Sequence, residues 1–140
     1  METHTKAIGN LGELAAMFAL NRKGIPISLP YGDNQRYDLI IDHNNKLSKV
    51  QIKTCLKDKD GMCTFPLQSK LNHTTNKNKT TYINEVDYFI LYCISLDKLA
   101  IVPIEQVKDK KNFNLRVTPP KNNQGNVNYF DDYSLDKILI

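Results

Sequence analysis

The fold is decided by residues 38–54, which read DLIIDHNNKLSKVQIKT. Two runs rich in β-branched and other apolar residues, Asp38–Asp42 and Lys49–Thr54, lie on either side of the turn sequence HNN. Such runs, separated by a few turn-forming residues, are typical of strands that pair with each other. The stretch therefore predicts a β-hairpin.

Three polar side chains share one face of this expected hairpin. Side chains on a strand repeat every second residue, so Gln51 and Lys53 lie together, and Asp38 opens the neighbouring strand. A carboxylate and an amide oxygen are hard ligands that suit Mg²⁺, above all when substrate phosphates complete its coordination. Lys53 beside such a cation could orient the attacking water in phosphodiester hydrolysis and stabilise charge on the phosphate. A polar face on a solvent-exposed strand would explain the same pattern without any chemistry.

The segment before the hairpin predicts a helix from Ala7 to Leu20, AIGNLGELAAMFAL, with Thr5 as its cap and its end at Gly24. The main apolar stripe is Ile8, Leu11, Ala15 and Phe18, and the opposite side holds Gly9, Ala16, Met17 and Leu20. A helix with two apolar sides is expected to be covered on both. Glu13 lies on the second side. Burial of an unpaired carboxylate costs several kcal/mol, so we expect a metal, a cation or a donor beside it. A glutamate at the helix edge that reaches solvent is the alternative.

The rest of the chain adds strands, loops and one short helix. We expect a strand at Ile25–Pro30, a turn at Tyr31–Arg36, an exposed basic loop at Ser69–Thr81, a hairpin of Val86–Ile94 and Lys98–Ile104 at the centre of the sheet, an edge strand at Asn114–Thr118, and a last helical turn at Tyr133–Ile140 capped by Asp132.

Length and composition fit one domain over residues 1–140. With 41% hydrophobic and 24% charged residues, the chain is excluded from the disordered and collagen-like classes. It has no apolar run of membrane-spanning length and no signal peptide, so we expect a soluble protein of a prokaryotic-type cytosol. The net charge of +4 permits nucleic-acid binding without demanding it. The three cysteines, Cys55, Cys63 and Cys93, show no CxxC spacing, which supports neither a disulfide framework nor a zinc knuckle and favours reduced, partly buried thiols.

The order of these residues resembles the PD-(D/E)XK nuclease superfamily over about Lys6 to Pro103. A helix carrying Glu13 is followed by Asp38 at the head of a strand and by Gln51-Ile52-Lys53 on the next strand. Within the superfamily this pattern is most similar to the group I intron-encoded homing endonucleases, whose last motif has a glutamine in place of the acid. Two departures are Tyr37 at the position of the name-giving proline, and Gln51 itself, which removes one negative ligand.

The resemblance implies a fold, a site and a cofactor. The fold is an α/β restriction-endonuclease-like αβββαβ core with a mixed central sheet. The resemblance implies Asp38, Gln51 and Glu13 as metal ligands, Lys53 as the catalytic lysine, and Mg²⁺ as the cofactor, for which Mn²⁺ can substitute.

Basic residues are concentrated around the expected site. Between His43 and Thr81 there are eight lysines and two aspartates, a surplus of six positive charges that exceeds the net charge of the whole chain. Lysines neutralise phosphates, and amide, hydroxyl and imidazole groups bond phosphates or base edges. The expected DNA-binding residues are Tyr31, Asn34, Gln35, Arg36, Lys57, Lys70, Asn72, His73, Lys77 and Lys79. An ordinary solvated loop and a plain structural turn are the alternatives.

The function expected from the sequence is Mg²⁺-dependent, site-specific cleavage of double-stranded DNA by a homing endonuclease encoded in a group I intron. A chain of this length offers one active site, so cutting both strands favours a homodimer or homotetramer. Three alternatives stay open: a Holliday-junction resolvase-like nuclease, a catalytically inactive DNA-binding protein of the same fold, and an α/β domain unrelated to nucleic acids.

Overall fold

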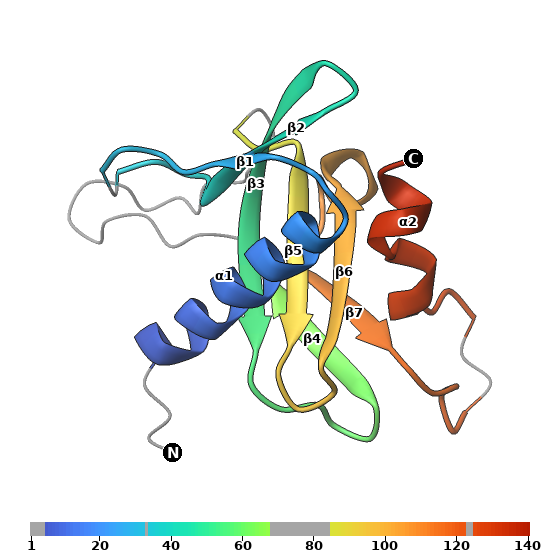
Figure 1. Ribbon diagram of the computed structural model, residues 1–140. Coiled ribbons are helices and arrows are strands. Elements are labelled where there is room, and N and C mark those ends of the chain that lie inside the picture. Colours follow the sequence, from blue (N-terminus) through green and yellow to red (C-terminus); the bar gives the residue numbers. More distant parts are fainter. Residues whose placement is uncertain (1–4, 33, 68–84, 123–124) are drawn as a thin grey trace.

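The computed structural model describes residues 5–32, 34–67, 85–122 and 125–140. Its central element is a five-stranded sheet of order β1-β2-β3-β5-β6, in which β3 and β5 are parallel and all other neighbours antiparallel (Figure 1). The elements are α1 (Thr5–Arg22), β1 (Ile27–Ser28), β2 (Leu39–His43), β3 (Lys46–Cys55), β4 (Met62–Pro66), β5 (Tyr88–Cys93), β6 (Lys98–Pro103), η1 (Ile104–Gln106), β7 (Asn112–Arg116), η2 (Phe130–Tyr133) and α2 (Leu135–Ile138). The mixed α/β class with a mixed central sheet is confirmed.

The hairpin predicted from residues 38–54 is present as β2 and β3. The two strands pair from Leu39↔Val50 to His43↔Lys46. Asn44 and Asn45 have φ angles of 54° and 62°, so they form a two-residue loop of the kind that fits the twist of a hairpin. The turn is therefore tighter than predicted, because His43 still belongs to the strand.

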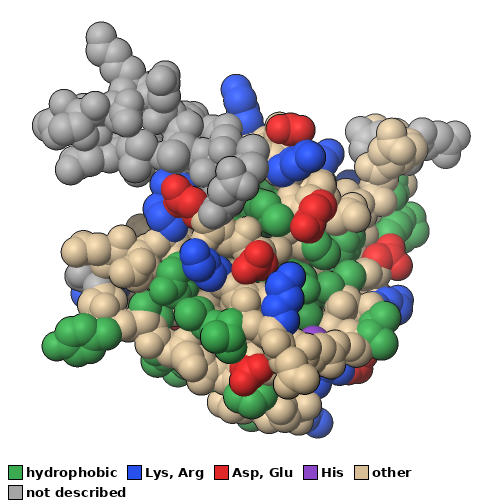
Figure 2. Space-filling model, turned by 90° about the horizontal axis from the view of Figure 1, so that it is seen from above, with side chains coloured by type: hydrophobic (Ala, Val, Ile, Leu, Met, Phe, Trp, Pro, Cys, Tyr) green, Lys and Arg blue, Asp and Glu red, His purple; other side chains and the backbone are tan. Residues whose placement is uncertain are grey.

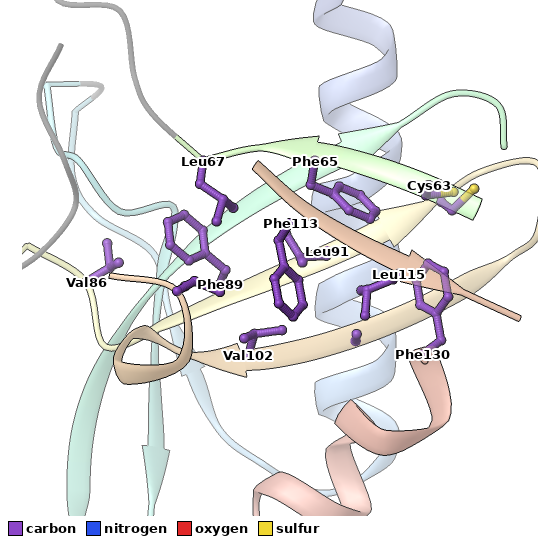
Figure 3. Packing of buried hydrophobic residues seen from close by; sticks show 13 residues of the cluster. Cys63, Phe65, Leu67, Val86, Phe89, Leu91, Val102, Phe113, Leu115 and Phe130 are labelled. Atoms are coloured by element: carbon purple, nitrogen blue, oxygen red, sulfur yellow. The ribbon is translucent and has the colours of Figure 1, made fainter. Parts of the chain in front are cut away.

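The five-stranded sheet has a hydrophobic core on each face. Helix α1 crosses one face (Figure 1), and this core contains Ala16, Leu20, Ile25, Leu39, Ile41, Val50, Ile52, Ile90, Ile101 and Leu139. On the other face the two-stranded sheet of β4 and β7 covers β5 and β6, and Phe65, Phe89, Leu91, Val102, Phe113, Leu115 and Phe130 fill the space between the sheets (Figure 3). Alternate residues of β3 thus face different cores: Val50 and Ile52 lie under α1, and Cys55 borders the second core.

Helix α1 is longer than predicted and buries a different face. Its buried residues are Gly12, Ala16 and Leu20, while Leu11, Leu14 and Phe18 are 37%, 60% and 67% exposed. The predicted main stripe and the predicted cover on both sides are therefore wrong. Small residues occupy the packed face because the helix lies very close to β3: a Cβ atom on Gly12 would lie 1.8 Å from Thr54 Oγ1.

The end of α1 follows the glycine signal. Gly24 has a φ of +81°, its N–H donates to Asn21 O, and the Ile25 N–H donates to Leu20 O. This is the pattern of a Schellman C-cap, accompanied by burial of Leu20 and Ile25 in the same core. The predicted end at Gly24 is confirmed. Thr5 is the first described residue and already belongs to the helix, so its predicted role as a cap is wrong.

Several other predictions are corrected by the structure. The strand expected at Ile25–Pro30 is reduced to two residues. The second hairpin is present, but β6 is an edge of the sheet and β3 is its centre. The edge strand expected at Asn114–Thr118 is β7, which pairs with β4 in a separate sheet. β4 has no counterpart among the elements predicted from the sequence.

The last helical turn and the segment before β5 were also predicted from the sequence. The last helical turn begins one residue after Ser134, whose side chain, rather than that of Asp132, accepts the Lys137 N–H. The expected basic loop Ser69–Thr81 lies outside the described residues. None of the helices in the described residues combines the length and hydropathy that crossing a bilayer requires.

Candidate active site

Asp38 lies where β2 meets the middle of β3. Its backbone N–H donates to Val50 O at 2.8 Å, and its carboxylate Oδ2 accepts the Ile52 N–H at 2.7 Å. The carboxylate thus takes the place of a strand carbonyl at the end of the β2–β3 pairing. Burial raises the pKa of Asp38, while the Ile52 hydrogen bond and the positive charge of Lys53 act in the opposite direction.

Gln51 and Lys53 lie on β3, just beyond its last pair with β2. Because β2 pairs with β3 only as far as Leu39↔Val50, the next step of the register faces Asp38 with Gln51. Both Gln51 and Lys53 are half-buried, and they share a strand face by alternation. Lys53 is close enough to Asp38 to lower the pKa of that carboxyl. The structure therefore places these three residues together, as the sequence predicts.

Glu13 comes to the same place from α1. The close approach of the helix to Thr54 at Gly12 fixes the position of the next residue, Glu13, relative to β3. The side chain of Glu13 is half-buried, which lies between the two alternatives that the sequence left open, a buried carboxylate and one that reaches solvent. Burial and then the negative charge of Asp38 raise the pKa of Glu13, which shows that the two carboxylates lie within electrostatic range of each other.

These donors fit a hard divalent cation. Two carboxylates that repel each other and an amide side chain next to them offer oxygen ligands, the type that Mg²⁺ and Mn²⁺ prefer. A cation between the carboxylates would remove the repulsion that raises the pKa of Glu13. Asp38, Glu13 and Gln51 are the residues that could hold it, and Lys53 stands beside them.

The predicted DNA-binding residues differ in their surroundings. Tyr31, Asn34, Gln35 and Lys57 are exposed. Arg36, in contrast, forms an ion pair in which its Nε lies 2.9 Å from Glu85 Oε2. The structure thus gives Arg36 a role in anchoring the segment before Asp38. Lys70, Asn72, His73, Lys77 and Lys79 lie outside the described residues.

Charges of both signs are mixed on the end of the molecule seen in Figure 2, wherever the surface is not grey. A cavity of about 500 Å³ also brings charges of both signs together, and it is lined by Lys49, Glu85, Val86, Asp87, Ile104, Glu105 and Lys108. Lys49 shares its strand face with Gln51 by alternation, and its Nζ lies 5.6 Å from the centre of the Tyr37 ring. Positive charge around the described part of the site is therefore partly balanced by carboxylates.

Two features that position the site were not predicted from the sequence. The first is Gly12, which sets the distance between α1 and β3. The second is the Ile52 N–H, which fixes the Asp38 carboxylate. A glycine on an apolar helix face was a usable signal for close packing. A backbone N–H donor leaves no trace in residue types.

Comparison with known proteins adds a family to this geometry. The sequence profile of the PD-(D/E)XK endonuclease family matches residues 3–136. No curated protein matches the sequence. Among solved structures, a bacterial homing endonuclease, I-Ssp6803I, superposes with a TM-score of 0.74 and 22% sequence identity, covering 94% of this chain and 88% of that chain. At this identity the structural match shows a shared fold, whereas the family profile spans nearly the whole sequence. The chain therefore belongs to the PD-(D/E)XK endonuclease family.

Proposed function

We propose that this endonuclease is Mg²⁺-dependent, that it hydrolyses double-stranded DNA at a specific site, and that it is a homing endonuclease encoded in a group I intron. We further propose that it acts on chromosomal DNA in a prokaryotic-type cytosol. The observation that carries the proposal is the placement of Asp38, whose carboxylate accepts the Ile52 N–H and lies within electrostatic range of both Glu13 and Lys53.

Each site residue has a distinct proposed task. Asp38, Gln51 and Glu13 would hold the cation, with Asp38 kept in one orientation by its hydrogen bond to Ile52. When bound, Mg²⁺ supplies Lewis-acid stabilisation of the charge that develops on the phosphate. The Lys53 ammonium would orient the attacking water and add positive charge on the side of the incoming nucleophile. Mn²⁺ would serve in place of Mg²⁺ because it accepts the same oxygen ligands.

Gln51 decides between an active and an inactive protein. An amide oxygen is a neutral ligand, so the site carries one negative charge less than it would with a carboxylate at position 51. A DNA-binding protein without catalysis is therefore the second candidate, supported by Gln51 alone. In the active reading, Glu13 supplies the missing negative charge from α1.

The proposal also covers the DNA-binding surface and the oligomeric state. Tyr31, Asn34 and Gln35 are exposed directly before Asp38, so they would contact DNA near the scissile bond. One chain brings one candidate site, and cleavage of two antiparallel strands is met most simply by a symmetric homodimer or homotetramer. The fold shared with a bacterial homing endonuclease supports the homing part of the proposal by analogy.

The test is a cleavage assay on the intact insertion site of the interrupted gene, with linear duplex, four-way junction and unrelated duplex as parallel substrates. The proposal expects double-strand cleavage of the insertion site that requires Mg²⁺ and is lost in Asp38→Ala. Preference for the junction would identify a resolvase-like nuclease. Binding without cutting at any Mg²⁺ or Mn²⁺ concentration would identify an inactive relative. An open reading frame that lies outside any intron would remove the homing part of the proposal.

A further inference from the structure

The three cysteines of the chain meet at one point of the fold. Cys55 ends β3, Cys93 ends β5, and Cys63 lies in β4. Their Sγ atoms all lie within 4.8 Å of one another, although they come from three strands and two sheets. Cys63 and Cys93 are buried and Cys55 is half-buried, so the cluster has one side toward solvent. Spacing along the sequence cannot show such a cluster, which is why the absence of a CxxC motif was not informative.

We propose that Cys55, Cys63 and Cys93 form a binding site for one thiophilic d¹⁰ metal ion of the Zn²⁺ class. Three sulfurs bound to Zn²⁺ at about 2.3 Å lie about 3.8 Å apart in a tetrahedral arrangement, so the cluster needs to contract by only about 1 Å. Soft thiolates select such ions and reject Mg²⁺, which keeps this site chemically separate from the carboxylate site.

The surroundings of the cluster hold the thiols in place. The β3–β5 pairing continues past both strands, because the Ile94 N–H donates to Cys55 O and the Ser95 N–H to Leu56 O. Ser95 also accepts the Asp58 N–H at 2.8 Å and donates to the Asp58 carboxylate, which ties the loop after β3 to the loop after β5. The Ser95 hydroxyl lies 3.5 Å from Cys93 Sγ. A metal here enters a frame that is already built, with its fourth position left to water or another small ligand.

The bland explanation of buried cysteines is that they fill the core as small apolar residues. That explanation predicts no meeting of thiols, yet all three cysteines of the sequence take part in the cluster. Because Cys55 and Cys93 belong to the five-stranded sheet and Cys63 to the two-stranded sheet, the ion would join the two sheets across the second core. Its role is therefore a structural clamp at the end of the strand that also carries Gln51 and Lys53.

The test is titration of the reduced, metal-free full chain with Cd²⁺, followed by the ultraviolet thiolate-to-cadmium charge-transfer band. We expect one Cd²⁺ per chain, displacement by Zn²⁺, and an affinity at least tenfold lower in Cys55→Ser. The thermal unfolding midpoint should rise with Zn²⁺ in the natural chain and stay level in Cys55→Ser. Carboxylates give no such band, so Asp38→Asn should leave it unchanged whether or not the chain cleaves DNA.

Control variants make the result decisive. Thr64→Ala alters the exposed neighbour of Cys63 and should bind Cd²⁺ as the natural chain does. If a variant of the buried Cys63, such as Cys63→Ser, fails to fold, replacement of the half-buried Cys55 still allows metal affinity to be compared with that of the natural chain. No charge-transfer band at a tenfold excess of Cd²⁺, or a band of equal strength and affinity in Cys55→Ser, would overturn the proposal.

Discussion

Asp38 is the residue on which the chemistry depends most. It is the carboxylate that meets both Glu13 and Lys53 electrostatically, and its orientation is fixed by a backbone donor rather than by a side chain that could be exchanged. A site built in this way should respond to single substitutions as a unit.

The first prediction concerns Asp38→Ala and Lys53→Ala. Each should lower the single-turnover cleavage rate by about 100-fold or more, roughly 3 kcal/mol, because each removes stabilisation of the transition state. Affinity for the DNA target, measured in EDTA, should stay within a few-fold. Asp42→Ala, at an exposed position of β2, and Lys46→Ala, at an exposed position of β3, are matched controls that should cut normally. Near-normal cutting by either site variant would remove that residue from the site.

The second prediction concerns Gln51. Gln51→Glu should retain more activity than Gln51→Ala, because glutamate presents an oxygen at the same reach and alanine presents none. The added negative charge should lower the Mg²⁺ concentration needed for half-maximal cleavage. The measurement is the Mg²⁺ dependence of the rate for all three proteins. Equal activity of the alanine variant would show that Gln51 is not a ligand.

The third prediction concerns Glu13→Gln and has a pH dependence. Burial, and then the negative charge of Asp38, raise the pKa of Glu13 above its ordinary value, so the folded chain holds this proton more tightly than the unfolded chain. The contribution of Glu13 to the free energy of unfolding is therefore present at low pH, and it is lost as the pH rises through the pKa that Glu13 has in the folded chain. Glu13→Gln should therefore raise the unfolding midpoint in EDTA more at pH 7 than at pH 4, while the Mg²⁺-dependent cleavage rate falls at least tenfold, about 1.4 kcal/mol.

Exposed Glu105 provides the control for this pair of measurements, because Glu105→Gln should change neither the midpoint nor the rate. If Glu13→Gln behaves in the same way, Glu13 is a solvent-reaching residue of the helix edge, and the site reduces to Asp38, Gln51 and Lys53.

At the scale of elements, the contact of α1 with β3 sets the position of Glu13. Gly12→Ala would bring a Cβ atom to 1.8 Å from Thr54 Oγ1 and 3.0 Å from Thr54 Cβ. We expect it to lower the free energy of unfolding by roughly 1–2 kcal/mol, since overpacking outweighs the better helix propensity of alanine. Gly9→Ala is the matched control: with no atom within 4 Å of its added Cβ, it should raise that free energy by up to about 1 kcal/mol.

Chemical denaturation of both variants checks this prediction, and adding Thr54→Ala to Gly12→Ala should restore part of the loss. If Gly12→Ala proved as stable as Gly9→Ala, α1 would lie farther from β3 than the structure shows.

Local patterns predicted the elements better than their partners. The β2–β3 hairpin and the β5–β6 hairpin follow from alternation and short turns, and α1 ends at Gly24 as its sequence indicates. The buried face of α1 was wrong because large apolar residues were expected inside, whereas Gly12 and Ala16 allow the close contact. The pairing of β4 with β7 joins residues about fifty positions apart, and no local pattern carries that information.

In the candidate site, too, local sequence predicted the residues, and the tertiary fold determines the contacts between distant segments. Asp38, Gln51 and Lys53 were predictable because they share one hairpin, and Glu13 because a carboxylate on an apolar helix needs a partner. The Ile52 hydrogen bond, the Arg36–Glu85 ion pair and the meeting of the cysteines depend on the tertiary fold. The roles of Lys70, Asn72, His73, Lys77 and Lys79 stay predictions.

At the scale of the whole molecule, DNA affinity should depend on the basic segment that precedes β5. Replacing Lys77 and Lys79 together with alanine should flatten the plot of log affinity against log salt by up to about 2 units, because each lost phosphate contact contributes about 0.9. Target preference should change little. The exposed pair Lys110 and Lys111 is a charge-matched control. An unchanged slope with high target affinity would place the DNA surface elsewhere.

The parallel pairing of β3 with β5 also governs the order in which the enzyme becomes competent during synthesis. All four residues of the candidate site lie within the first 53 positions, but β3 receives its second neighbour only when residues 88–93 have been made. Until then the strand that bears Gln51 and Lys53 has one unpaired edge, and the core behind it lacks most of its aromatic side chains. A nascent chain whose residues up to Lys53 have left the ribosome, but whose residues 88–93 have not, therefore contains all four site residues without the neighbouring strand that supports β3. The ability to cut DNA arrives only with the second half of the polypeptide.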